Sequence, residues 1–250
     1  LFRNVVATSS AYPLIQLPAA WDVTTGDAST IVCVIDTGQT NHPDLDARQI
    51  AGYDMISDPA IAGDGSGRDA DPTDVGDGQG VQPSSFHGTH VAGTIGAESD
   101  NGTGVCGVTW AGRLMHVRVL GIGGGTDFDI SNGILYAARL ANVSGTLPAE
   151  RADVINMSLG GPGFSQTSQD ACTSAHDAGV VVVAAAGNNN SPNLFYPASY
   201  ADVISVAAVD FNSSRAPYSN FNALIDIAAP GGNTAADLNG DGYADGVLST

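Results

Sequence analysis

The sequence predicts an α/β fold, a doubly wound, mostly parallel sheet with helices on both faces. Short apolar runs alternate with amphipathic or small-residue segments, which is the order expected of β-α-β units. The apolar runs are nearly continuous, as in strands that are buried on both faces of a sheet. Neither a repeat nor a linker divides the 250 residues. One large domain over residues 1–250 is therefore expected.

The elements follow in a regular order along the chain. The first strand is predicted at 31–35, and a helix at 87–96 follows it after a long loop. The remaining predicted strands are 114–120, 154–157, 180–186 and 203–208, and the remaining predicted helices are 130–141 and 168–178. Two segments, 58–80 and 229–246, are rich in Gly and Asp without apolar periodicity, which predicts loops.

The charge of the chain is strongly unbalanced. It carries 26 acidic residues against 8 basic ones, and the net charge is −18. All eight bases are Arg. A polyanion would be repelled, so nucleic acid is not expected as a partner. No apolar run approaches the roughly 18 residues that span a bilayer, so no membrane partner is expected either. A solubilising surface and bound calcium both remain open as reasons for the acidity.

The three cysteines allow at most one internal disulfide. Cys33 lies within an apolar run, where a buried free thiol is expected, so Cys106 and Cys172 are the first pair to consider. The chain begins at Leu1 without an initiator Met or a basic-then-apolar leader. A processed product is the expectation from that beginning.

Three polar residues stand at the ends of predicted elements. Asp36 ends the strand at 31–35, His87 opens the helix at 87–96, and Asn188 follows the strand at 180–186. Because parallel strands present their carboxyl ends at one edge, these side chains are expected to converge there. An acid, an imidazole and an amide donor are three parts of an acyl-transfer site.

Two other classes of site share parts of these motifs, the aspartic peptidases and the zinc sites. Asp-Thr-Gly at 36–38 also occurs in aspartic peptidases, but no second such motif and no all-β pattern accompany it. His87 and His90 are three residues apart and have no Glu between them. In a zinc-binding helix motif the two histidines are four residues apart, with a Glu between them. The combination of all three segments favours acyl transfer.

The segments around Asp36, His87 and Asn188, and the order in which they follow along the chain, resemble those of the subtilisin-like serine peptidases, the subtilase family. Segments 156–161, 196–198 and 203–208 extend the resemblance, which runs from about Val23 to the last residue. It implies a subtilisin-like fold and a secreted serine endopeptidase. By resemblance, Asp36 orients His87, and His87 moves the proton of the nucleophile. Asn188 would stabilise the oxyanion, and His90 would be structural.

The resemblance also suggests where a polypeptide substrate lies. An extended peptide would add between two glycine-containing edges, formed by Gly123, Gly124, Ser158, Leu159 and Gly160. Structural turns would use the same residues, and that reading stays open. The small residues at 184–187 predict an open, apolar specificity pocket.

Calcium is the expected cofactor. By resemblance, one site consists of Asp44, Asn101 and the carbonyls of Thr103 and Val105. A second resembles the first part of an EF-hand loop, with Asp237, Asn239, Asp241 and Asp245, although Leu248 cannot supply the usual final Glu. The loop acids Asp64, Asp69 and Asp71 are a third candidate, for which a solvated charge run is the alternative.

The nucleophile of the family lies in a Gly-Thr-Ser-Met-Ala-like segment, shortly after a stretch resembling 246–250. Ser249 lacks the glycine-flanked turn of such a segment. We therefore expect a single subtilisin-like catalytic domain, truncated before its serine, with a complementary C-terminal segment as partner. The alternative is a non-catalytic acidic peptide-binding module, or an inactive peptidase fragment.

Overall fold

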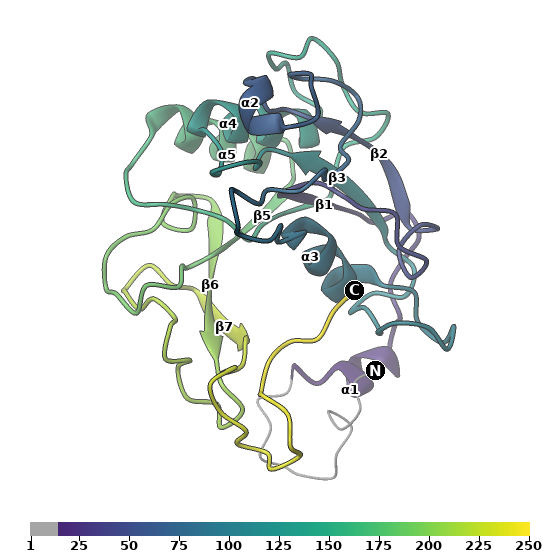
Figure 1. Cartoon of the computed structure of the whole chain (residues 1–250), viewed down its shortest axis with the longest axis vertical. Helices are drawn as coiled ribbons and strands as arrows, with labels where there is room; N and C mark the ends of the chain where they lie inside the picture. The colour runs from purple at the N-terminus through teal and green to yellow at the C-terminus, as the bar shows by residue number, and fades with distance from the viewer. Residues whose placement is uncertain (1–14) are drawn as a thin grey trace.

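A single parallel sheet organises the computed structural model, which describes residues 15–250 (Figure 1). Its strands are ordered β2-β3-β1-β4-β5-β6-β7, and every neighbouring pair is parallel. The strands are β1 (Ile31–Asp36), β2 (Gln49–Asp54), β3 (Arg113–Arg118), β4 (Val154–Met157), β5 (Val181–Ala185), β6 (Val203–Val209) and β7 (Ile227–Pro230). The parallel α/β prediction is confirmed.

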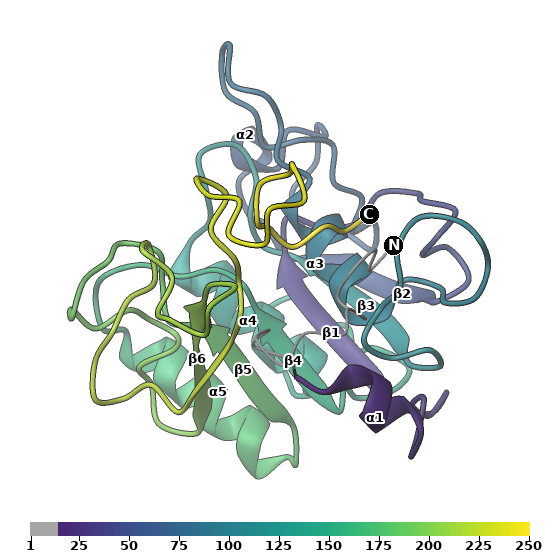
Figure 2. The same cartoon turned by 90° about the horizontal axis from the view of Figure 1, so that it is seen from below.

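Helices cover both faces of this sheet (Figures 1 and 2). On one face, α3 (His87–Gly96) packs against β1 and β3; on the other, α4 (Asp127–Ala137) packs against the same strands and against α5 (Gln166–Asp177). The side chains of β1 alternate accordingly. Cys33 and Ile35 join the core with α4 and α5, whereas Val34 joins Ala92 of α3. Continuous apolarity in β1 thus follows from burial on both sides.

Side-chain caps mark the starts of α4 and α5. Thr126 and Ser165 accept hydrogen bonds from backbone amides in the first turns of α4 and α5, as N-cap side chains do. Two short helices, α1 (Leu17–Trp21) and α2 (Pro59–Ala62), were not predicted. Helix α2 lies within the predicted loop 58–80, where Asp58 caps it. None of the helices among residues 15–250 is long and apolar enough to cross a membrane.

The two edge strands, β2 and β7, were also not predicted. β2 contains Gly52 and polar residues, and β7 ends in Pro230, so neither shows the continuous apolar pattern of the central strands. Each has one hydrogen-bonded neighbour in the sheet. An edge strand tolerates Pro and polar side chains because one of its sides is not paired.

The first pair to consider for a disulfide, Cys106 and Cys172, is not joined in the structure. All three cysteines are free, with Cys33 and Cys172 buried. Burial raises the pKa of the Cys33 thiol, and it raises that of Cys172 to about 12. Cys106 instead lies near the Ser99 hydroxyl, with Sγ 2.9 Å from Oγ.

At β1 the sheet changes the direction in which successive strands are added, although all strands stay parallel. The chain places β3 and β2 on one side of β1, and β4 to β7 on the other. In open α/β sheets, ligands bind beyond the carboxyl ends of the strands at such a switch point. Asp36 is the last residue of β1 and lies at this point.

Candidate active site

Asp36 and His87 form a close pair at the carboxyl end of β1. His87 Nδ1 lies 2.8 Å from Oδ1 and 2.9 Å from Oδ2 of Asp36. The carboxylate is fully buried, whereas the His87 side chain is 45% exposed. A proton on Nδ1 satisfies the carboxylate and leaves the lone pair of Nε2 available as a base.

The surrounding backbone holds this pair in place. The Thr37 amide donates to Asp36 Oδ1 at 2.7 Å, and the Gly88 amide donates to the Thr37 hydroxyl at 2.9 Å. Gly88 must be glycine, since a Cβ there would lie 2.4 Å from the Gly38 carbonyl oxygen. The first turn of α3 therefore sits directly against the end of β1.

The site favours the protonated form of His87. The hydrogen bond to Asp36 raises the pKa of His87, burial opposes this, and the negative charges of Asp36 and Asp77 raise it further. Because its protonated form is stabilised, His87 suits the role of a base that becomes an imidazolium during the reaction.

Asn188 lies at the same edge of the sheet. It follows β5, and the register pairs Val34 of β1 with Asn156 of β4, which pairs with Val183 of β5. Asp36 and Asn188 are thus two strands apart, a lateral separation of about 10 Å. Asn188 is exposed and borders an open cavity of about 570 Å³ that also contains Asn156 and Ser158.

Sequence reasoning missed Asn220, which holds the Asn188 loop. Its side chain is buried, with Oδ1 accepting from the Asn189 amide at 2.9 Å and Nδ2 donating to the Ala186 carbonyl at 2.9 Å. It also lies beside Gly187, whose φ of 101° requires glycine. No motif identifies this residue, because its role comes only from tertiary contacts more than thirty residues away.

The predicted substrate edges face one another. Gly123, Gly124, Ser158, Leu159 and Gly160 all line a second cavity of about 440 Å³, together with Tyr196 and Tyr200. Ser158 borders both this cavity and the one beside Asn188. An extended chain lying here would therefore lead into the cavity that Asn188 borders.

The first predicted calcium set is partly brought together. Asp44 is fully buried, with Oδ1 accepting from Asn101 Nδ2 and Oδ2 from the Val105 amide, both at 2.8 Å. Thr103 donates its amide to Asn101 Oδ1. Among the described residues, no Arg forms an ion pair with Asp44.

The side chains of the other two sets form hydrogen bonds and an ion pair within the chain. Asp64 lies 3.0 Å from Arg118, while Asp69 and Asp71 accept hydrogen bonds from turn amides. Asp237 accepts from the amides of Gly240, Asp241 and Gly242; Asn239 and Asp241 accept from nearby amides, and Asp245 accepts from that of Leu238. Within residues 15–250, no three His, Cys, Asp or Glu side chains form a group able to hold a metal.

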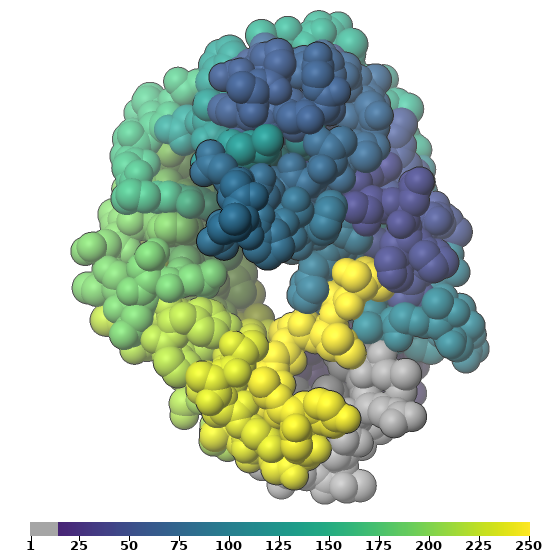
Figure 3. All heavy atoms as spheres, viewed as in Figure 1, coloured from purple at the N-terminus to yellow at the C-terminus, as the bar shows by residue number. Residues whose placement is uncertain are grey.

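Ser249 does not face the candidate base. Its hydroxyl donates to the His90 carbonyl at 2.7 Å, and His90 Nε2 lies 3.2 Å from the Val247 carbonyl. Figure 3 shows the C-terminal segment, in yellow, on the surface of the molecule that faces the viewer, below a hollow. No serine hydroxyl among the described residues hydrogen-bonds to the His87 ring.

Known proteins share this sequence and fold. The chain is 47% identical to an extracellular protease of Xanthomonas campestris pv. campestris over 90% of its length, and 41% identical to a thermophilic serine proteinase of a Bacillus species, also over 90%. It spans only 40% and 49% of those two proteins. It is 37% identical to subtilisin Savinase of Lederbergia lenta, covering 92% of this chain and 74% of that one.

A solved structure and a family model agree with these relatives. A protease of Pseudoalteromonas arctica superposes with a TM-score of 0.85 at 42% identity, over 94% of this chain and 74% of that one. The model of the subtilase family, Peptidase S8, matches residues 27–249. With this match over most of its length, the chain belongs to the subtilase family.

Proposed function

We propose that this chain forms most of the catalytic domain of a secreted, calcium-stabilised serine endopeptidase. The observation that carries the proposal is the pairing of His87 Nδ1 with the buried carboxylate of Asp36. This pairing occurs at the switch point of a subtilase sheet, with Asn188 on the same edge. The names of the relatives from Xanthomonas campestris and Dichelobacter nodosus, both called extracellular, support secretion.

The residues divide the chemistry among them. Asp36 holds the His87 tautomer whose Nε2 can take the proton of a serine hydroxyl, and it stabilises the resulting imidazolium. His87 then returns the proton to the leaving amine. Asn188 would donate its amide to the oxyanion that forms at the scissile carbonyl. The nucleophilic serine, in this proposal, belongs to a complementary segment C-terminal to residue 250.

The substrate is an extended polypeptide. The two edges around the 440 Å³ cavity offer backbone groups at Gly123 and at Ser158 to Gly160, whereas the amide and carbonyl of Gly124 pair with Gly121 in a turn. Small residues at 184–187 line the neighbouring cavity, which suits an apolar side chain next to the scissile bond.

The donor atoms near Asp44 fit a hard cation. A fully buried carboxylate without an Arg partner lies beside an amide side chain in a tight loop, and Ca²⁺ prefers carboxylate, amide and carbonyl oxygens. We propose Asp44, Asn101, Thr103 and Val105 as one site. Asp237, Asn239, Asp241 and Asp245 are proposed as a second, at which the carboxylates would have to move together around the ion, because they form no such group in this structure. Asp64 is engaged by Arg118, so the third set is weaker.

A fluorophosphonate probe tests the catalytic part of the proposal. The full-length protein is expected to be labelled on one serine, whereas Asp36→Asn should slow labelling by on the order of 10⁴-fold because the wrong His87 tautomer forms. Asp170→Asn, a surface change on α5, is the control and should react like the wild type. Equal, weak labelling of all three would favour the non-catalytic peptide-binding module.

A further inference from the structure

A second acid approaches His87 from the 58–80 loop. The carboxylate of Asp77 accepts two hydrogen bonds from Ser85, one from its amide at 2.6 Å and one from its hydroxyl at 2.7 Å. Ser85 precedes His87 by two residues. In turn, its hydroxyl accepts a hydrogen bond from the His87 amide at 3.3 Å. Asp77 is thereby connected to the first residue of α3.

The hydroxyl of Ser85 is used in both directions. It donates to Asp77 and accepts from His87, so the charge on Asp77 polarises the bond to the helix start. A negative charge near the first turn of a helix also interacts favourably with its free amides. Phe86 between them has a φ of 48°, a conformation that a non-glycine residue holds only when its surroundings fix it.

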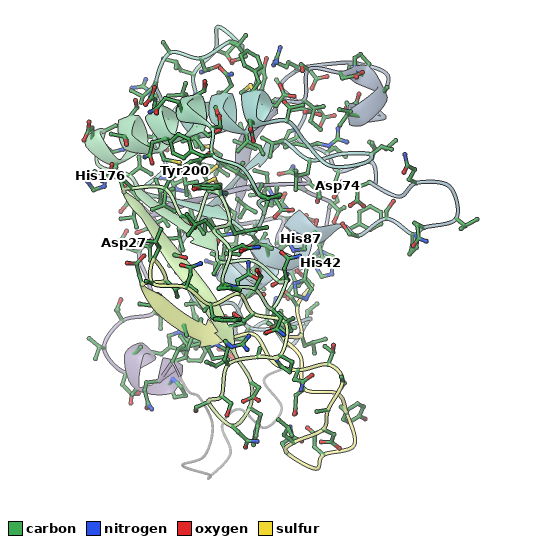
Figure 4. All side chains as sticks on the ribbon, turned by 90° about the vertical axis from the view of Figure 1, so that its left-hand side faces the viewer. Asp27, His42, Asp74, His87, His176 and Tyr200 are labelled. Carbon is green, nitrogen blue, oxygen red and sulfur yellow. The ribbon has the colours of Figure 1, made fainter. Side chains whose placement is uncertain are left out.

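The charge of Asp77 also reaches the His87 ring. Burial opposes ionisation of Asp77, but the two hydrogen bonds from Ser85 lower its pKa below the ordinary value, so it is ionised at neutral pH. The charged groups that act on the ring are Asp36, from the end of β1, and Asp77, from the loop. Both charges raise the pKa of His87. In Figure 4, Asp74 of the same loop lies above His87.

We propose that Asp77 is a positioning residue for His87, clamping Ser85 against the start of α3 and stabilising the imidazolium by its charge. Asp36 acts on Nδ1 from the buried side. Asp77, which is partly buried, acts from the 58–80 loop. The catalytic part of this inference rests on the proposed peptidase function, whereas the electrostatic part concerns the folded chain alone.

Titration of the histidines by NMR tests the electrostatic part. The full-length protein carries ¹³C-labelled histidine, and the His87 signal is assigned by its loss in His87→Gln. In Asp77→Asn the pKa of His87 should fall, while Asp77→Glu, which keeps the charge, should stay near the wild type. Asp170→Asn removes one acid on α5 and should change nothing. An unchanged value in Asp77→Asn overturns the proposal, as does an equal fall in Asp170→Asn.

A second variant covers the case in which Asp77→Asn does not fold. Ser85→Ala removes the bond from the hydroxyl and leaves the one from the Ser85 amide. The carboxylate is then held less firmly, and the pKa of His87 should fall, though less than in Asp77→Asn. A wild-type value in this variant contradicts the clamp.

Kinetics separates positioning from general damage. Since His87 must be neutral to accept a proton, Asp77→Asn should move the acid limb of kcat/KM to lower pH. Relative to its plateau, activity on that limb should rise about twofold. Loss of structure would scale the whole profile without moving it. A shifted NMR titration in a protein that no fluorophosphonate labels would refute the peptidase function alone; normal labelling with no shift would refute only the role of Asp77.

Discussion

The hydroxyl of Thr37 accepts a hydrogen bond from the Gly88 amide at 2.9 Å, which joins the residue after the acid to the residue after the base. Thr37 is buried, and it also interacts with the carboxylate of Asp74. This contact sets the distance between β1 and the first turn of α3. The geometry of the acid–base pair therefore depends on a side chain that takes no part in the proton transfer.

Replacing Thr37 by Val should lower both stability and activity. The buried Gly88 amide would lose its partner, which costs about 1–2 kcal/mol of unfolding free energy. A small displacement of His87 should also reduce kcat/KM by about tenfold. Urea unfolding and peptide hydrolysis measure the two effects. Thr37→Ser keeps the hydroxyl and should retain most of both; similar losses in Ser and Val variants would contradict this account.

The sequence predicted the parts of the site that lie at the ends of regular elements. Asp36 and His87 flank apolar or periodic segments, so both residue type and position carried information, and the structure places them in contact. Thr37, Asn220 and Asp77 gave no such signal. Their roles depend on partners in loops whose paths are set by tertiary packing, which single-sequence periodicity does not contain.

The same distinction explains the errors in the fold. Central strands such as β1 are apolar throughout because both faces are covered, so they were found. The edge strands β2 and β7 contain Gly, Pro and polar residues, and their pairing became visible only with their neighbours in place. Cys106 and Cys172 could only be named as the first pair to consider, because the number of cysteines does not state which thiols are close; the structure leaves both free.

Replacing Asn188 by Ala should reduce kcat with little change in KM. The expected loss is about 10²- to 10³-fold, the range known for removing the oxyanion-donor asparagine of subtilisin. Steady-state hydrolysis of a peptide anilide measures it. Asn189 is the matched control, since it adjoins Asn188 and is also exposed, and Asn189→Ala should keep wild-type kcat. Equal rates for the two variants would exclude Asn188 as the oxyanion donor.

Replacing Arg118 by Met should strongly destabilise the fold. Arg118 is fully buried, 2.6 Å from the buried Asp54, and also contacts Asp64 and the Ala62 carbonyl. Loss of the guanidinium leaves a buried carboxylate unpaired, which costs about 3–5 kcal/mol. Arg113 forms a more exposed pair with Glu150, so Arg113→Met should cost much less unfolding free energy than Arg118→Met. Denaturant unfolding distinguishes the two, and similar costs would contradict the buried network.

Removing calcium should lower the melting temperature of the full-length protein. A ligand that binds only the folded state stabilises it by about 2.7 kcal/mol at a hundred times its Kd. Asp44→Asn should abolish part of the response to a chelator, and Asp241→Asn another part, because they belong to separate proposed sites. Differential scanning calorimetry with and without added Ca²⁺ measures this. A wild-type melting temperature that ignores the chelator would refute both sites.

The buried His116 should make the fold sensitive to acid. Its side chain is inaccessible, and burial lowers its pKa from 6.5 to about 4, although the Gly38 backbone partly offsets this. Between those two values the unfolded chain binds a proton that the folded chain excludes, so this contribution to stability falls as the pH falls. His116→Leu cannot take up that proton. Relative to this variant, the wild type should lose about 3 kcal/mol of unfolding free energy between pH 7 and pH 4.

His176→Gln, on the exposed side of α5, should retain the wild-type acid sensitivity. Parallel stability curves for the wild type and His116→Leu over this range would show that the buried imidazole is not the source.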